Sequence, residues 1–219
     1  DEAPKTALAT LVMRVVWMSA VVGLGMQALT LTVGVALGGS PSLASAVIGA
    51  VGKVSWSTTV CAALAVGLSV PRATLPGTAL WGLIAAPTSF HLARAVQQAL
   101  GAAAGLSAAA ATPALVVWGT AGLKGAQYAL LGLVLLSLNR RAEAPILAYL
   151  GVGALMGLTF GGLILGLGVQ GGTIAPTAAA LLPAAVNELI FPALCAGVVY
   201  VTTRAGVLMG SERTAHKQS

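Results

Sequence analysis

Four ionisable residues lie deep inside long apolar segments, where charge is most costly if those segments cross a membrane. They are Lys53, Arg94, Lys124 and Glu188. Counted along a helix with a rise of 1.5 Å per residue, each lies roughly 15 Å from the nearest polar break on one side. A charge at that depth costs at least ~2.5–3.5 kcal/mol on insertion scales. We therefore expect all four to face a bundle interior, a partner or water.

The balance of these charges favours an anionic ligand. Three of the four residues are cations and one is a carboxylate, so two positive charges are left without a counter-charge. An anionic solute, a lipid headgroup or an acidic group of a partner would supply it. Alternatively, internal ion pairs would only fix the register of the helices. The predicted substrate site comprises Lys53, Arg94, Lys124, Asn187, Glu188, His91 and Gln98, with Glu188 and His91 handling charge balance or protons.

Further polar residues share helical faces with these charges at steps of three and four residues. The stripes are Ser19, Gly23, Gln27, Thr30 and Gly34; Lys53, Ser57 and Cys61; Thr88, His91, Arg94 and Gln98; and Thr120, Lys124 and Gln127 or Tyr128. Such stripes predict a common polar interior. In addition, Pro192 lacks the N–H that would bond the carbonyl of Glu188. Freed backbone at this depth often marks the binding site of a transporter.

The composition shows which elements must position these residues. Of 219 residues, 58% are hydrophobic and 7% are charged, whereas a soluble domain carries roughly a quarter charged residues. We therefore predict an all-α polytopic integral membrane protein with six transmembrane helices, each at least the ~20 residues that cross a bilayer. The expected spans are 6–38, 43–70, 78–105, 113–138, 145–169 and 177–202. Residues 1–205 form one transmembrane domain, and 206–219 form a polar cytoplasmic tail.

The basic residues at segment ends predict the orientation. They lie at the N-terminus, in the second and fourth loops and in the tail: Lys5, Arg72, Arg140, Arg141, Arg204, Arg213 and Lys217. The other three loops carry no Lys or Arg. The positive-inside rule then places both termini in the cytoplasm, in a bacterial-type cytoplasmic (inner) membrane. No basic run with interleaved aromatic residues indicates nucleic-acid binding.

A weak internal repeat divides the chain into three helical hairpins, roughly 6–73, 74–143 and 144–205. Lys53 and Lys124 are 71 residues apart, as are Gln27 and Gln98. Mitochondrial-type carriers also contain three hairpins, but their Pro-x-[Asp/Glu]-x-x-[Lys/Arg] signature is absent, so that family is not inferred.

Other motifs indicate packing rather than chemistry. Gly153, Gly157 and Gly161 form overlapping G-x-x-x-G motifs, which predict close helix contact within the chain. Cys61 and Cys195 lie in apolar runs and are expected to be free, buried thiols. No cluster of metal ligands is present and no cofactor is specified. The sequence has no H-E-x-x-H, no G-x-S-x-G and no phosphate loop, so we do not expect an enzyme.

These features predict a small transporter, channel or substrate-binding transporter subunit that handles an anionic or polar small solute near mid-bilayer. In size and expected topology the chain is similar to the substrate-binding subunits of energy-coupling-factor transporters, although its first helix lacks their A-x-x-x-A contact motif. The alternative is a non-transporting accessory or scaffold subunit of a larger membrane complex, whose buried charges meet partner membrane subunits. The expected partners are the lipid bilayer and the solute, with partner subunits in the second case.

Overall fold

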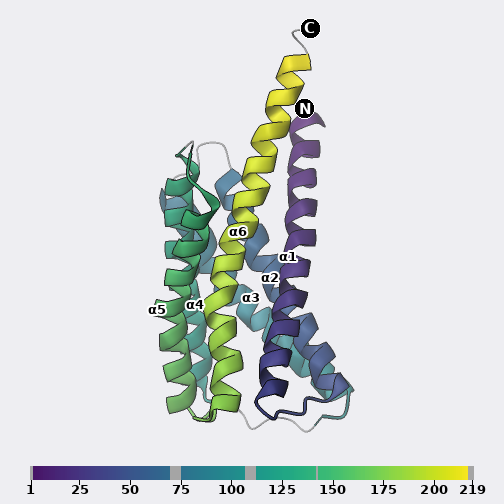
Figure 1. Cartoon of the computed structure of the whole chain (residues 1–219), viewed down its shortest axis with the longest axis vertical. Helices are drawn as coiled ribbons and strands as arrows, with labels where there is room; N and C mark the ends of the chain where they lie inside the picture. Colours follow the sequence, from purple (N-terminus) through teal and green to yellow (C-terminus); the bar gives the residue numbers. More distant parts are fainter. Residues whose placement is uncertain (1, 70–74, 107–111, 142, 217–219) are drawn as a thin grey trace.

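The chain folds into a bundle of helices. The computed structural model describes residues 2–69, 75–106, 112–141 and 143–216, with side chains described within 9–68, 75–106, 112–141 and 143–203. These residues form six α-helices and no strand, which confirms the all-α prediction (Figure 1). The helices are α1 (Glu2–Ala36), α2 (Leu43–Ser69), α3 (Leu75–Ala103), α4 (Ala114–Asn139), α5 (Ile146–Gln170) and α6 (Ala178–His216).

Five of the helices contain segments long and apolar enough to cross a membrane. These segments are Ala9–Ala36, Leu43–Leu68, Ala114–Asn139, Ile146–Gln170 and Ala178–Thr203. Helix α3 is the exception, because it carries several polar residues, among them His91, Arg94, Gln97 and Gln98. A chain built from such helices is a helical membrane protein.

The helix boundaries place some of the predicted segment ends differently. Helix α6 continues through His216, so the predicted polar tail at 206–219 begins inside a helix. Of the basic residues that predict the orientation, Arg72 and Lys217 lie outside the described residues, as do the side chains of Lys5, Arg204 and Arg213.

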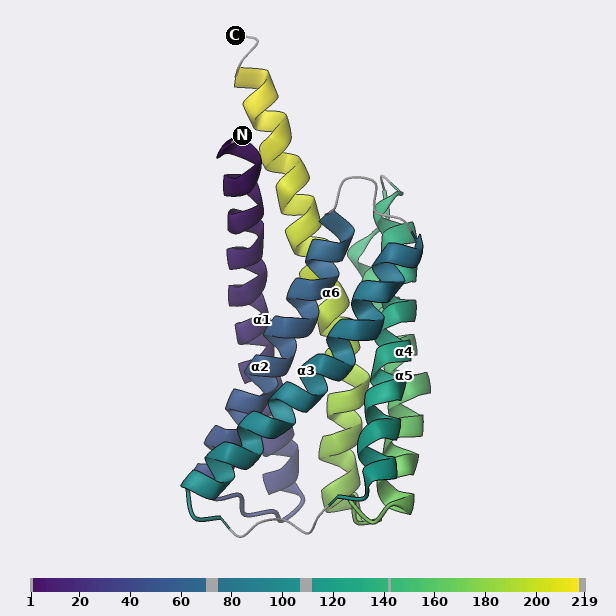
Figure 2. The same ribbon diagram turned by 180° about the vertical axis from the view of Figure 1, so that it is seen from behind.

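The six helices follow one another around a closed ring, and three of them also contact one another across its centre. Each helix contacts the next one in the chain, and α1 also contacts α6. Within the ring, α2, α4 and α6 contact one another. Both ends of the chain lie at the same end of the bundle as the α4–α5 turn (Figures 1 and 2). Consequently α2, α4 and α6 all begin at the opposite end.

Glycines on α5 allow its close contact with α6. A Cβ on Gly157 would lie 2.5 Å from the carbonyl oxygen of Leu189, and one on Gly161 would lie 2.8 Å from the Cβ of Glu188. Real Cβ atoms do not approach that closely, so these positions need glycine. The predicted internal packing of this G-x-x-x-G segment is confirmed. The carbonyl that Pro192 frees, that of Glu188, faces Gly157; it is covered by α5.

The tightly packed core lies toward the end that holds the termini. No residue of α6 from Ala178 to Ile190 is fully buried, whereas Phe191, Cys195 and Val199 are. Helix α2 changes in the same way, since Gly52 is its only buried residue before Ser57. Around α2 and α6 the bundle is therefore sealed on the side of the termini and looser on the other side.

Candidate functional site

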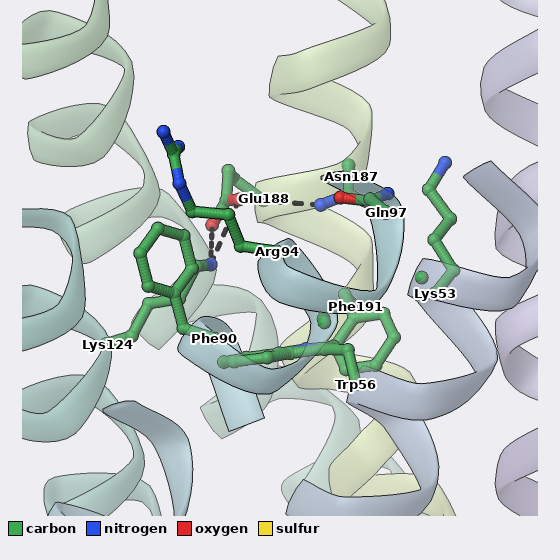
Figure 3. A pocket seen from close by; sticks show the side chains of 11 residues that line it. Lys53, Trp56, Phe90, Arg94, Gln97, Lys124, Asn187, Glu188 and Phe191 are labelled. Atoms are coloured by element: carbon green, nitrogen blue, oxygen red, sulfur yellow. Dashed lines mark hydrogen bonds and ion pairs between the residues drawn. The ribbon is translucent and has the colours of Figure 1, made fainter. Parts of the chain in front are cut away.

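A cavity of about 250 Å³ lies where α2, α3, α4 and α6 meet (Figure 3). Its lining is polar on one side and aromatic on the other. The residues are Gly52, Lys53, Trp56, Phe90, Ala93, Arg94, Gln97, Lys124, Asn187, Glu188 and Phe191. Five of the seven predicted site residues are among them: Lys53, Arg94, Lys124, Asn187 and Glu188. The structure thus brings the four deep charges to one cavity.

The charged residues share one depth because they share one position in their helices. Lys53, Lys124 and Glu188 are each the eleventh residue of α2, α4 and α6. These three helices begin at the same end of the bundle, so each charge lies about 15 Å along its helix. Arg94 lies nine residues before the end of α3, which runs in the opposite direction, and so reaches a similar level.

Lys124 and Glu188 form a buried ion pair. The Lys124 Nζ donates hydrogen bonds to the two carboxylate oxygens of Glu188 at 3.0 and 2.8 Å, with side-chain exposures of only 11% and 13%. The amide of Asn187 donates to the same carboxylate at 3.4 Å. The ammonium also lies 5.0 Å from the ring centroid of Trp56, a favourable cation–π distance. One of the three cations is therefore neutralised inside the chain.

Lys53 is held by neutral groups of α1. Its Nζ donates to the carbonyl of Met26 at 3.4 Å and to the hydroxyl of Thr30. On the same face, the Gln27 amide donates to the carbonyl of Ala46 on α2 at 3.0 Å. The predicted polar stripe of the first helix thus joins α1 to α2, and no acidic side chain among the described residues compensates the charge of Lys53.

The third cation that lines the cavity is Arg94. Its side chain is half-buried, and among the described residues its guanidinium has no hydrogen-bond or ion-pair partner. It extends past the Lys124–Glu188 pair on the opposite side of the cavity from Lys53 (Figure 3). With Glu188 matched by Lys124, the lining carries a formal excess of two positive charges.

Trp56 and Phe191 close the cavity on the side of the termini, and the ring of a third aromatic residue, Phe90, lies beside the Lys124 ammonium (Figure 3). Trp56 and Phe191 each come three residues after a charged lining residue, toward the end where the termini lie, and Phe90 precedes Arg94 on the antiparallel α3. The rings of Trp56 and Phe191 have centroids 6.3 Å apart, and Trp56 packs edge-on against Tyr128 at 5.8 Å. Trp56 and Phe191 lie together below the charged groups in Figure 3. They join the cavity to the apolar core behind it.

Two predicted site residues do not reach the cavity. Gln98 is exposed on the outside of α3, and the ring of His91 packs against that of Trp118 at 4.7 Å. The inward face of α3 instead carries small residues in steps of three and four: Gly82, Ala86, Ser89 and Ala93.

The predicted polar stripe of α3 runs through Arg94 to Gln98 and therefore leaves out Gln97, which lies on the face formed by the small residues. Helix packing sets the rotation of α3, since Gly82 sits directly against the backbone of α4 at Tyr128 and Ala129. Gln97 continues this packed face, and its amide lies over Gly52 of α2, where a Cβ would collide with it. The spacing of small residues was the available signal.

Comparison of the chain with models of protein families, with curated proteins and with solved structures gave no match. The fold alone defines the class of the chain, a helical membrane protein.

Proposed function

We propose that this chain crosses the membrane six times and binds an anionic or polar small solute in its central cavity. It would act as a small transporter, a channel or the substrate-binding subunit of a transporter. The observation that carries the proposal is the uncompensated charge of Arg94 and Lys53 in a cavity at mid-depth. Charges at such depth are costly unless a ligand, a partner or water balances them.

The packing around the cavity supports access from one side. Trp56, Phe191 and the core behind them block the way toward the termini, while the first ten residues of α6 leave the other side loosely packed. Arg140 and Arg141 lie in the α4–α5 turn, at the same end as the termini. By the positive-inside rule that end is cytoplasmic, so the solute would enter from the side away from the cytoplasm.

The size of the cavity limits the solute. Pockets for drug-sized ligands enclose roughly 300–1,000 Å³, and this one encloses about 250 Å³. A small anion fits this space better than a nucleotide or a lipid headgroup with its chains.

Flux measurements on the purified chain test this function. The protein would be reconstituted into liposomes, and uptake of a panel of small radiolabelled organic and inorganic anions compared with that of empty liposomes. We expect uptake of at least one anion if the chain is a transporter or channel, or a rise in its melting temperature with that anion if it is a substrate-binding subunit; Arg94→Gln should weaken the uptake or the binding at least tenfold. If no anion is taken up, and none changes the melting temperature of the protein in detergent, the proposal is wrong. The accessory-subunit alternative would then be favoured.

A further inference from the structure

The cavity has two chemically different halves. On the side of the termini it is bounded by the rings of Trp56 and Phe191, and the ring of Phe90 lies higher, beside the Lys124 ammonium (Figure 3). Toward the other end it carries the charged and amide side chains of Lys53, Arg94, Gln97, Asn187 and the Lys124–Glu188 pair. A solute entering from the open side would therefore meet the polar layer first and the aromatic layer second.

From this layering we propose that the solute is a small organic monocarboxylate with an apolar body, bound with its carboxylate at Arg94 and its body against Trp56, Phe90 and Phe191. The inference rests on the proposed function and narrows it to one chemical class. An inorganic anion such as phosphate has no apolar part and would leave the aromatic layer without a contact.

The assignment of the carboxylate to Arg94 follows from what the other cations already contact. Lys124 is matched by Glu188 and lies over Trp56, and Lys53 is held by Met26 and Thr30 of α1. The guanidinium of Arg94 lines the cavity without a described partner. Its planar group carries parallel N–H donors that match the two oxygens of a carboxylate, which a lysine ammonium cannot do.

A second residue of α3 fits the same orientation. Phe90 lies one helical turn from Arg94 toward the termini. Gln97, one turn from Arg94 in the opposite direction, does not take part, because its amide lies against Gly52 of α2, on the Lys53 side of the cavity (Figure 3). A single helix, α3, thus presents an aromatic ring and, toward the open side, a guanidinium, in the order that an amphiphilic acid requires.

Benzoate is a suitable probe, and benzamide, acetate and inorganic phosphate are its controls. Benzamide keeps the ring and lacks the charge; acetate keeps the carboxylate and lacks the ring. Trp17, Trp81 and Trp118 are 68%, 47% and 68% exposed on the outside of the bundle, so replacing them by Phe leaves Trp56 as a fluorescent reporter inside the cavity. Binding would be followed by this fluorescence and by the melting temperature of the protein in detergent.

We expect benzoate to bind at least ten times more tightly than benzamide, acetate or phosphate. Arg94→Gln should remove this preference over benzamide. Arg94→Lys should weaken benzoate binding at least tenfold, because lysine keeps the positive charge and lacks the parallel N–H donors of the guanidinium. Lys53→Met should weaken it less than Arg94→Lys does. Acetate or phosphate binding as tightly as benzoate would overturn the inference while leaving the anion site intact. If none of the three anions binds, the monocarboxylate inference is wrong, and the proposed function fails as well only if the wider panel of anions gives neither uptake nor a shift in melting temperature. Benzoate binding that survives Arg94→Gln would also overturn the assignment.

Discussion

The ion pair between Lys124 and Glu188 offers the sharpest test of the cavity's structure. Replacing Glu188 by Gln keeps the shape of the side chain and removes its charge. The Lys124 ammonium, with its side chain 11% exposed, would then lie at mid-depth without a counter-charge. At 2.8 Å and an effective dielectric constant of about 20, the attraction that is lost amounts to roughly 6 kcal/mol.

Several contacts offset part of that loss. The amide that Glu188→Gln introduces can still accept one hydrogen bond from Lys124, and the cation–π contact with Trp56, worth about 1–2 kcal/mol, remains. Removing one partner of a buried pair typically costs about 3–5 kcal/mol. We therefore expect Glu188→Gln to lower the free energy of unfolding by that amount, measured by SDS titration in mixed micelles and followed by far-UV circular dichroism.

Two matched variants isolate the pair. Adding Lys124→Met to Glu188→Gln removes the unpaired charge, so the double variant should recover most of the lost stability. Lys53→Met is the control, because Lys53 lies at the same depth and its hydrogen-bond partners in the described part of the chain are neutral; its effect and that of Glu188→Gln should simply add. If Glu188→Gln changes stability by less than about 1 kcal/mol, or if Lys53→Met rescues it as well as Lys124→Met does, the pairing described here is wrong.

Three further predictions test the packing and orientation around the site. Gly157→Ala should lower the free energy of unfolding by about 2–3 kcal/mol, because its methyl group would be overpacked against Leu189. Gly162→Ala should be nearly neutral in the same unfolding assay, because a Cβ at that position would have no atom of another helix within 4 Å. Copper phenanthroline with oxygen should join the buried thiols of Cys61 and Cys195, whose sulfurs are 2.8 Å apart, into a disulfide between α2 and α6; equal mobility of treated and untreated protein on non-reducing gels would contradict that contact. In right-side-out vesicles, an impermeant maleimide should label Ser40→Cys and leave Arg141→Cys unlabelled; the opposite pattern would invert the proposed orientation.

The sequence predicts the helical membrane class well, because hydrophobicity and length alone decide it. The sequence also predicts the depth of the four charged residues, Lys53, Arg94, Lys124 and Glu188, since distance along a helix follows from the number of residues. The structure adds which charges neutralise each other: nothing in the spacing selects Lys124 over Lys53 as the partner of Glu188, and the choice depends on how α4 and α6 pack.

The rotation of α3 could not be predicted from its polar residues. In a membrane the outer surface is apolar, so a polar stripe is expected to face inward. Here the close contact of Gly82 with α4 determines the inward face, which leaves Gln98 outside and brings Gln97 into the cavity. The contact between Cys61 and Cys195 could likewise not be predicted from the sequence, because the two residues belong to helices far apart in the chain.

The central claim, a cation-lined cavity open to water at mid-membrane, is tested most directly by the neighbours Gln97 and Gln98. Each would be replaced by Cys in a chain whose two buried cysteines are changed to Ala, and the rates of reaction with an anionic and a cationic methanethiosulfonate reagent would be compared. We expect Gln97→Cys to react, several times faster with the anionic reagent, and Gln98→Cys, on the outer face of α3, to stay unmodified because lipid would cover that face in the proposed arrangement. An unreactive Gln97→Cys, or one that prefers the cationic reagent, would contradict the account.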